Sequence, residues 1–463
     1  MSTQAPRKIS IGSRDMSSSG WIPVWHRFAA AFDARFRDIH LRDVFRDTSY
    51  GFLVRVGGGG LAFGANWLLA RLLGPSGVGI YYLAFTTITI AAVLSRLGLS
   101  ETCVRYASPA VASGEWAIVA GVRRTALLLV LAASSAVCVI LLIAAPAISL
   151  YLFHQPALIN TLRVIAFALI PFALLNIDAA MLQATGHVTA ATVVQAAAIP
   201  GALFILLALM GISYATPTLA AGCYTLAVII VFFGGNVFWR CAVRNAVIIA
   251  KRYESRRLLR TGLRIMGVNS ISLVMAWTDT ICLGIWWPSA DVGRYGIAVR
   301  VALLTTIVIS AVNSAAGPKF AELSAQNNVT ALRKLTQRTS LGMTIVALPI
   351  LVVLLVFPRF ILGLFGSGFA GASVVLMILA GGQFIEVVTG AVGHLLMMSG
   401  HERSLRNILA ISAVLNLTLN FIMVPLFGMI GAAVATAISL SLMNLMCIAS
   451  VKKKLGIWPL PKW

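Results

Sequence analysis

The 463-residue chain has few charged residues, and acidic ones are the scarcest. Only 11% of its residues are Asp, Glu, Lys or Arg, with 14 acidic against 36 basic. Apolar residues make up 59%, and the mean hydropathy is +0.92. Soluble domains carry about 25% charged residues, and disordered chains have low hydrophobicity. The composition excludes both classes and predicts an integral membrane protein.

Motifs for catalysis, nucleotide hydrolysis and metal binding are also missing. No G-x-x-x-x-G-K-[ST] loop is present, and the glycine run at residues 57–60 lies in an apolar stretch without the lysine. The six cysteines are scattered without a C-x-x-C spacing. No His, Cys and acidic cluster predicts a metal site, and no Ser, His and Asp grouping predicts a hydrolase. We therefore expect no cofactor, no metal and no enzyme activity.

Long continuous apolar runs account for most of the chain after residue 50. Twelve of them reach the ~20 residues that a helix needs to cross ~30 Å of hydrocarbon. Strands of a membrane barrel would be shorter and would alternate apolar with polar residues. The sequence therefore predicts an all-α integral membrane protein with 12 transmembrane helices. Their expected spans are 51–73, 79–98, 125–148, 157–180, 189–210, 216–238, 264–286, 292–314, 340–362, 372–396, 405–425 and 429–450.

The basic residues gather on one side of this expected topology. All but six of the 36 lie in the N-terminal segment, the linkers after even-numbered spans or the C-terminal tail. The positive-inside rule then places both termini in the cytoplasm. Basic linkers are ordinary in membrane proteins, so we expect contact with membrane lipid and no nucleic acid. The six other residues are Arg55, Arg71, Arg163, Arg294, Arg300 and Arg359.

The first 50 residues lack the apolar segment of a signal peptide and are expected to stay in the cytoplasm. Apolar side chains recur there every three or four residues from Trp21 to Ile39, beside Arg27 and Arg35. This spacing predicts an amphipathic helix at the membrane surface, with a charged disordered tail as the alternative. The expected divisions are an N-terminal segment 1–50, an N-lobe 51–238, a basic linker 239–263, a C-lobe 264–450 and a tail 451–463.

Three short matches indicate that the two lobes are repeats. They are Pro75-Ser76 and Gly79-x-Tyr81 with Pro288-Ser289 and Gly293-x-Tyr295, residues 146–153 with 358–365, and Gly186-His187 with Gly400-His401. The matched residues lie 212 to 214 positions apart. Because each repeat has six spans, the copies are parallel, and such lobes enclose the substrate cavity of many secondary transporters. We expect two six-helix lobes around a central cavity that works by alternating access.

Ionisable residues at membrane depth mark functional sites or structural pairs. Asp279 and Arg300 each lie about eight residues from the same outer turn, so both are expected ~12 Å deep on adjacent helices. They could form a structural ion pair between spans 7 and 8. In the alternative, Arg300 faces the cavity and binds an anionic substrate, while Asp279 orients it or titrates. The repeat places Asn66 opposite Asp279, which favours the cavity.

Other charges fall at different depths. Glu386 lies deep in span 10 and is the candidate for proton coupling, the alternative being a protonated side chain hydrogen-bonded between helices. Arg55 can snorkel to the membrane surface or reach a phosphate at the cytoplasmic mouth. Asp178 lies near an inner helix end and is expected to be solvated. The candidate substrate and cavity residues are Arg55, Asn66, Asp279 and Arg300, and the candidates for proton or ion coupling are Glu386 and Asp279.

Two regions are similar to a known family. They are Leu72-Leu-Gly-Pro-Ser-Gly-Val-Gly-Ile-Tyr-Tyr-Leu with Arg96-Leu-Gly-Leu-Ser and Arg105, and Met398-Ser-Gly-His-Glu402 with Asn416 to Gly431. They resemble the polysaccharide transport family, the Wzx-type lipid-linked oligosaccharide flippases of the multidrug, oligosaccharidyl-lipid and polysaccharide exporter superfamily. The resemblance implies movement of an undecaprenyl-diphosphate-linked repeat unit from the cytoplasmic to the periplasmic leaflet of a bacterial inner membrane. An anionic lipid-linked oligosaccharide is then the expected partner, with a polysaccharide polymerase and export machinery beside it.

Three other functions are alternatives. The first is a cation-coupled multidrug exporter or a peptidoglycan-precursor flippase of the same superfamily, although a cationic drug would favour more acidic residues in the N-lobe than Asp178. A membrane polymerase or ligase would need a large periplasmic loop, and the expected outer loops are short. An assembly scaffold is the last, and for it Arg300→Ala and Glu386→Gln should leave polysaccharide output unchanged.

Overall fold

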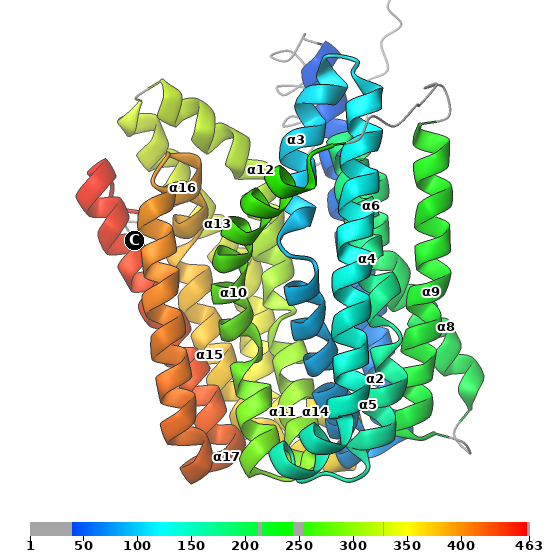
Figure 1. The fold of residues 1–463 in the computed structure, drawn as a ribbon. Coiled ribbons are helices and arrows are strands. Elements are labelled where there is room, and N and C mark those ends of the chain that lie inside the picture. Colours follow the sequence, from blue (N-terminus) through cyan, green and yellow to red (C-terminus); the bar gives the residue numbers. More distant parts are fainter. Residues whose placement is uncertain (1–38, 212–214, 244–252, 327, 461–463) are drawn as a thin grey trace, which may run out of the picture. The chain divides into compact units, whose positions relative to one another are not determined.

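The structure is a computed structural model that describes residues 39–211, 215–243, 253–326 and 328–460. All regular elements in these ranges are helices, which confirms the predicted all-α fold (Figure 1). The chain divides into the compact units Met1–Asp47 and Thr48–Trp463, and the packing below is that of the second unit. The amphipathic helix expected from Trp21 falls in residues 1–38, outside the described residues, as does 244–252 of the basic linker.

The helices of the N-lobe pack mainly on one another. Within it, α6 contacts α3, α4 and α9, and α9 also contacts α5 and α8. Two π-helical turns, η1 and η2, interrupt this lobe. The elements are α2 (Ile39–Ser95), α3 (Leu99–Ala112), α4 (Trp116–Ala147), η1 (Ile148–Leu152), α5 (Leu158–Ala166), α6 (Leu169–Ala184), α7 (Val188–Thr192), η2 (Val193–Ala198), α8 (Ile199–Met210) and α9 (Pro217–Ala242).

The helices of the C-lobe form a second group. Here α17 packs against α10, α15 and α16, and α13 packs against α12 and α15. The elements are α10 (Ser255–Trp286), α11 (Ser289–Ala302), α12 (Thr305–Ala325), α13 (Val329–Val356), α14 (Pro358–Gly363), η4 (Ser367–Ala372), α15 (Ser373–Thr389), α16 (Val392–Met398) and α17 (Glu402–Leu455).

The two longest helices, α2 and α17, are each folded back at a glycine. Gly74 and Gly428 have φ of 63° and 57°, a left-handed conformation that glycine adopts without steric cost. The hydroxyls of Ser404 and Ser450 lie 2.8 Å apart, although 46 residues of straight helix would extend ~69 Å. Each long helix is therefore a helical hairpin, and together they hold the expected spans 1, 2, 11 and 12.

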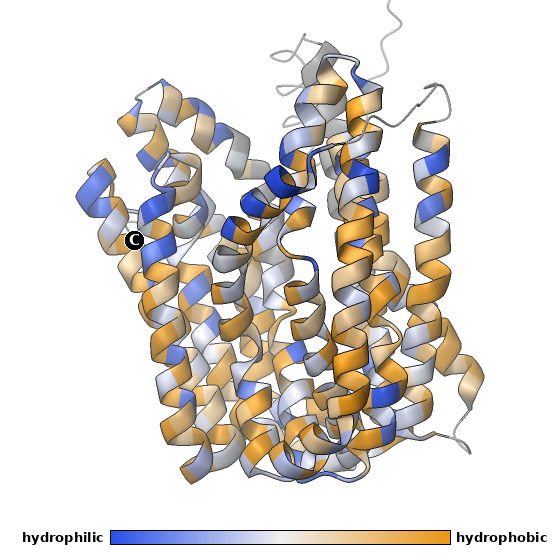
Figure 2. Cartoon of the chain, viewed as in Figure 1, coloured by the Kyte–Doolittle hydropathy of each residue, from blue (hydrophilic) through white to orange (hydrophobic). Residues whose placement is uncertain are grey.

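Among the described residues, seven helices are long and apolar enough to cross a membrane, and nine candidates result if each of two bent helix pairs counts as one span. The chain is therefore a multi-pass membrane protein. Every one of the twelve expected spans lies largely on helix, but the count of twelve crossings stays a prediction. Hydrophobic residues run along α4, α9 and α17, whereas hydrophilic residues gather near α3 and the start of α10 (Figure 2).

The two lobes touch where α2 crosses α11. A Cβ atom on Gly79 would collide with the backbone of Ser289 and Gly293, and one on Gly293 would collide with the backbone of Pro75 and Gly79. The contact is reciprocal, because Gly79 and Gly293 are matched in the sequence repeat and each packs against the segment that carries the other. Small residues allow this backbone approach, as they do at close helix crossings in membranes.

Candidate functional site

Two of the candidate residues, Asn66 and Arg300, lie around the junction of α2 and α11, and both contact Tyr82. The Tyr82 hydroxyl donates a 2.7 Å hydrogen bond to Oδ1 of Asn66, which lies in the other arm of the α2 hairpin. The guanidinium of Arg300, from α11 of the C-lobe, sits over the Tyr82 ring at 3.7 Å from its centroid. Arg300 also donates a 3.1 Å hydrogen bond to the carbonyl of Gly296. Tyr82 thus joins an amide of one lobe to a cation of the other.

Asp279 is at the centre of a separate, buried cluster inside the C-lobe. Its side chain is 6% exposed, and it accepts hydrogen bonds from Tyr295, Asn420 and Thr436. These donors come from α11 and from both arms of the α17 hairpin. A buried carboxylate needs such partners, since leaving it unpaired is costly. The cluster therefore ties three helical segments together around one acidic group.

The same tyrosine hydrogen bond occurs in both lobes. Tyr82 donates to Asn66, and Tyr295 donates to Asp279; in both cases the residues are 16 positions apart. The two pairs are related by an offset of 213, so Tyr82, and not the Tyr81 of the matched motif, occupies the place of Tyr295. The repeat detected in the sequence is thus also present in the hydrogen bonding.

The ion pair considered between Asp279 and Arg300 is not formed. Arg300 follows Tyr295 by five residues, which is about 140° around a helix. Tyr295 points to Asp279 inside the C-lobe, so Arg300 faces elsewhere and reaches Tyr82 of the N-lobe. The sequence places Asp279 and Arg300 at the same depth in the membrane. They do not meet because Arg300 lies on a different face of α11 from Tyr295, the residue that contacts Asp279.

Arg55 and Glu386 stand apart from these clusters. Arg55 is exposed on the first arm of α2, and Glu386 is half-buried on α15. Neither side chain makes a hydrogen bond or ion pair with another described residue. In the described part of the chain, no three His, Cys, Asp or Glu side chains are grouped as metal ligands.

The expectation that Asp178 is solvated is wrong. The side chain of Asp178 is 1% exposed and forms a 2.7 Å ion pair with Arg123 of α4. Arg123 also donates to Asn236 at 3.1 Å and lies over the Trp239 ring at 4.8 Å. The expected topology puts Arg123 in the cytoplasmic linker after span 2. In the structure Arg123 lies in the first turns of α4 and reaches Asp178, so the carboxylate is buried with a partner.

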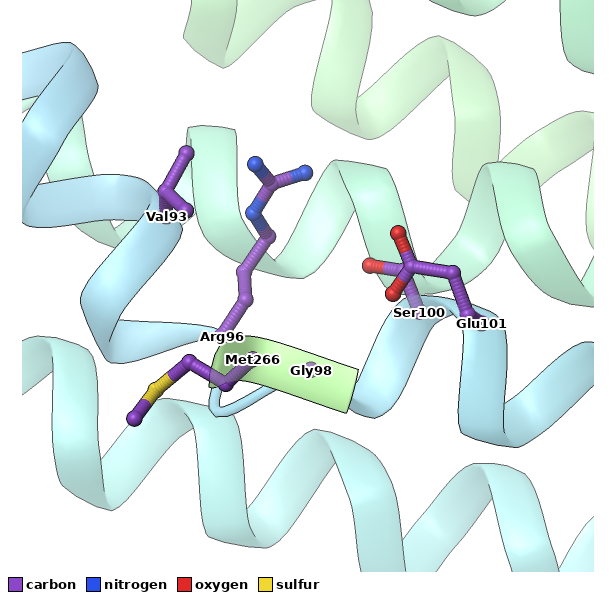
Figure 3. Close-up of a pocket in the computed structure, with 6 residues that line it drawn as sticks. All are labelled: Val93, Arg96, Gly98, Ser100, Glu101 and Met266. Carbon is purple, nitrogen blue, oxygen red and sulfur yellow. The ribbon is translucent and has the colours of Figure 1, made fainter. Parts of the chain in front are cut away.

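A polar cavity lies in the N-lobe next to the gap between α2 and α3. It has a volume of about 330 Å³, and four of its lining residues are Arg96, Ser100, Glu101 and Gln195. Arg96, Ser100 and Glu101 also line a smaller recess that reaches Met266 of α10 (Figure 3). Charge at membrane depth does not predict this cavity, because four of its six polar lining residues are uncharged.

The sequence match to known proteins covers most of the lobes. A model of the family described as "Polysaccharide biosynthesis protein" matches residues 68–374. The chain belongs to this family. The match confirms the resemblance found at residues 72–83, and it extends across the lobe junction and the polar cavity described above.

The chain is also similar to two proteins of Haloferax volcanii. The "Probable low-salt glycan biosynthesis flippase Agl15" is 26% identical over 86% of this chain and 81% of the relative. The "Probable flippase AglR" is 27% identical over 40% of this chain and 39% of the relative.

Solved structures share the fold of this family member at low sequence identity. An inward-facing multidrug resistance MATE family transporter of the MOP superfamily has a TM-score of 0.73 and 14% identity, covering 88% of this chain and 98% of the other. The lipid II flippase MurJ in an inward closed conformation has a TM-score of 0.69 and 14% identity, covering 88% and 87%. The chain therefore has the MOP transporter fold.

Proposed function

We propose that this protein is a flippase for a lipid-linked oligosaccharide. It moves an undecaprenyl-diphosphate-linked repeat unit from the cytoplasmic to the periplasmic leaflet by alternating access of its two lobes. The flipped unit is then used in the synthesis of surface polysaccharide or exopolysaccharide, by a polymerase and export machinery that act after it. The protein itself performs no bond-making or bond-breaking step.

Membership of the polysaccharide biosynthesis family is the observation that carries this proposal. The similarity to Agl15, which is named as a glycan biosynthesis flippase and is covered over 81% of its length, supports it. The chemistry of the substrate also fits: a diphosphate needs a cation, a glycan needs polar partners, and the lipid tail can stay in the bilayer.

The lobe junction supplies a cation where a moving diphosphate would need one. Arg300 belongs to the C-lobe but contacts Tyr82 of the N-lobe, so movement of the lobes changes its surroundings. In the proposal, Arg300 binds the diphosphate, and the exposed Arg55 attracts it at the cytoplasmic mouth. Asn66 offers a polar contact beside Tyr82. A guanidinium binds phosphate oxygens by charge-assisted hydrogen bonds, which are the stronger kind.

Coupling to an ion is assigned to the acidic residues at membrane depth. Glu386 has no hydrogen-bond or ion-pair partner among the described residues, so it can take up and release a proton without breaking a structural bond. Asp279 is held by three donors, so protonation there would loosen the cluster that joins α10, α11 and α17. Protonation of either Glu386 or Asp279 would therefore change the relative stability of the C-lobe conformations.

Contacts between the lobes beside the α2 hairpin turn fit a closed periplasmic end. Trp67 and Arg71 both donate to the carbonyl of Leu364, at 3.0 and 2.9 Å. The Phe63 and Phe365 rings meet edge to face, with centroids 5.3 Å apart. If both termini are cytoplasmic, the turn at Gly74 is periplasmic, and these contacts must separate when substrate leaves.

Depletion of the protein in its own organism tests the function. We expect lipid-linked repeat units to accumulate facing the cytoplasm while surface polysaccharide is lost, with both reversed by the wild-type gene. Unchanged polysaccharide on the depleted cells would overturn the proposal. Sensitivity to cationic drugs without any change in lipid-linked glycan would instead support a multidrug exporter.

A further inference from the structure

The polar cavity of the N-lobe has the size and lining of a ligand site. Its volume of about 330 Å³ is at the lower end of the ~300–1,000 Å³ found for small-molecule pockets. It lies between the end of α2, the first turns of α3, the middle of α6 and the π-helical turn η2. Its lining residues are Arg96, Ser100, Glu101, Val104, Asn176, Ala180, Gln183 and Gln195.

Amides that line the cavity belong to helices expected to cross the membrane. Asn176, Ala180 and Gln183 follow each other at spacings of four and three, so they form one stripe on α6. Gln183 and Gln195 are both exposed, although each belongs to a candidate span. An amide that faced hydrocarbon would have no hydrogen-bond partner, so these two are expected to face a water-filled space.

The backbone around the cavity is irregular at two points. Gln195 is carried by η2, and π-helical turns of this kind occur often at functional sites. Between α2 and α3, Leu97 and Gly98 have positive φ of 53° and 65°. A non-glycine residue in this region is uncommon, and such strain persists only where the surrounding structure holds it. Both irregular points direct polar residues into the same space.

Several polar atoms in the cavity have capacity for further hydrogen bonds. Arg96 donates through Nε to the carbonyl of Ala92, and its other two nitrogens have no hydrogen bond to a described residue. The hydroxyl of Ser100 is buried and has no partner among the described residues. The amide of Asn176 donates to the carbonyl of Phe172 at 2.8 Å, which leaves its oxygen available. Unsatisfied buried groups are costly and point to a missing partner.

The balance of charge in the cavity favours a neutral polar ligand. The single cation, Arg96, lies close enough to Glu101 for their charges to interact, so the cavity carries no excess positive charge. Amide, carboxylate and guanidinium groups together donate and accept, as sugar hydroxyls do, whereas a phosphate only accepts.

From these observations we propose that the N-lobe cavity binds sugar residues of the lipid-linked substrate, through the amides of Asn176, Gln183 and Gln195. The proposal rests on the proposed function and deepens it by separating two subsites. The diphosphate is held at the lobe junction by Arg300, and the glycan is held in the N-lobe.

The position of the cavity connects its occupancy to movement of the lobes. Gly98 packs against the backbone of Gly262 and Met266, which belong to α10 of the C-lobe. The irregular turn that forms one wall of the cavity is therefore also a contact between lobes. A sugar bound by Arg96 and Ser100 would therefore affect the packing of Gly98 against α10.

Binding to two purified lipids tests the proposal with the full-length protein in detergent. The probes are undecaprenyl diphosphate and the undecaprenyl-diphosphate-linked glycan extracted from cells depleted of the protein. The variants are the double variant Gln183→Ala/Gln195→Ala, each single variant, and Gln326→Ala as a matched control. Gln326 is an exposed amide at the end of α12, remote in sequence from the cavity, and its side chain contacts Glu322.

We expect the wild type and Gln326→Ala to bind the glycan-bearing lipid about tenfold more tightly than the bare diphosphate, the effect of one or two net hydrogen bonds. The double variant should bind both lipids equally, at the wild-type affinity for the bare diphosphate, and each single variant should lose part of the difference. Because both glutamines are exposed, unchanged thermal unfolding should accompany the loss.

Each other outcome decides against the proposal in a different way. If the double variant keeps the tenfold preference, the cavity does not bind sugar, and the flippase function stands. Should the double variant bind undecaprenyl diphosphate more weakly by the same factor, the cavity is a phosphate site and the assignment to sugar is overturned. If the wild type binds neither lipid, the proposed function fails and this inference fails with it.

Discussion

The two lobes keep the same tyrosine hydrogen bond and differ in what surrounds it. In the C-lobe the acceptor is the carboxylate of Asp279, which is buried and has two further donors. In the N-lobe it is the amide of Asn66, half-buried, with Arg300 of the opposite lobe over the donor ring. In the C-lobe, the tyrosine pair is therefore part of a buried cluster around Asp279. In the N-lobe, the tyrosine of the pair contacts Arg300 of the other lobe. Symmetric scaffolds of this kind can carry unequal sites.

A second difference lies in the buried ion pair. Arg123 and Asp178 pair inside the N-lobe, whereas the positions 213 residues later hold the uncharged Thr336 and Ala391. The buried acid of the C-lobe is Asp279, the acceptor of the repeated tyrosine hydrogen bond. The buried acid of the N-lobe is Asp178 on α6, which pairs with Arg123. The four predictions below test this division, from the largest expected effect to the smallest.

Arg123→Ala should cause the largest loss of stability. It would leave Asp178 charged and buried without its partner, which costs about 3–5 kcal/mol of unfolding free energy. Thermal unfolding of the purified protein in detergent measures the change. The double variant Arg123→Met/Asp178→Asn should recover much of the loss, because no lone buried charge is left. A loss below about 1 kcal/mol for Arg123→Ala would show that the pair is not buried in the protein.

Asp279→Ala should destabilise the protein by about 2–3 kcal/mol, since three donors, two of them buried, lose their acceptor. Asn66→Ala, the matching change in the N-lobe, should cost about 1 kcal/mol. Thermal unfolding of the two variants tests whether the buried Tyr295–Asp279 pair of the C-lobe stabilises the protein more than the half-buried Tyr82–Asn66 pair of the N-lobe. Equal losses would contradict that distinction.

Asp279→Asn separates charge from hydrogen bonding at the same position. The amide oxygen can still accept from Tyr295, so the loss of stability should be about 1 kcal/mol, close to that of Asn66→Ala. If Asp279 also couples an ion, transport by this variant should lose its dependence on the ion gradient. Vesicle transport assays with and without a proton gradient measure this, and an unchanged dependence would leave Glu386 as the coupling candidate.

Arg300→Ala should have a small effect on stability and a large effect on function. Loss of the contact with the Tyr82 ring costs about 1 kcal/mol. Loss of charge-assisted hydrogen bonds to a diphosphate should weaken binding of undecaprenyl diphosphate by about tenfold or more. Arg300→Lys keeps the charge and should bind with intermediate affinity. Wild-type affinity in Arg300→Ala would remove Arg300 from the phosphate site.

The sequence was sufficient for the all-α fold class, the placement of the helices along the chain and the repeat. Hydropathy located the helices because lipid requires long apolar runs. The meeting of Gly79 and Gly293 at the crossing of α2 and α11 is a finding of the structure, since the repeat alone does not bring the two glycines together. The register of the tyrosines was off by one residue, because sequence identity at Tyr81 does not reveal which hydroxyl reaches Asn66.

Side-chain pairing was harder to predict than the helices. Arg123 was counted with the topological charges, and only the packing of α4 on α6 shows that it neutralises Asp178. Sequence position gives the depth of Asp279 and Arg300 in the membrane, but their partners depend on which face of the helix each side chain occupies. The glutamines of the N-lobe cavity carry no charge, so their sequence positions do not mark them as a site. The structure shows that Gln183 of α6 and Gln195 of η2 line the same cavity.

The leaflet in which the lipid-linked glycan resides, measured in cells that carry only Arg300→Ala, tests the central claim most directly. The variant should be present at wild-type levels and unfold at nearly the wild-type temperature. We predict that the glycan stays inaccessible from the periplasm in these cells and accessible in cells with the wild type. Equal periplasmic accessibility in both would contradict the claim that the lobe junction at Arg300 carries the substrate across the membrane.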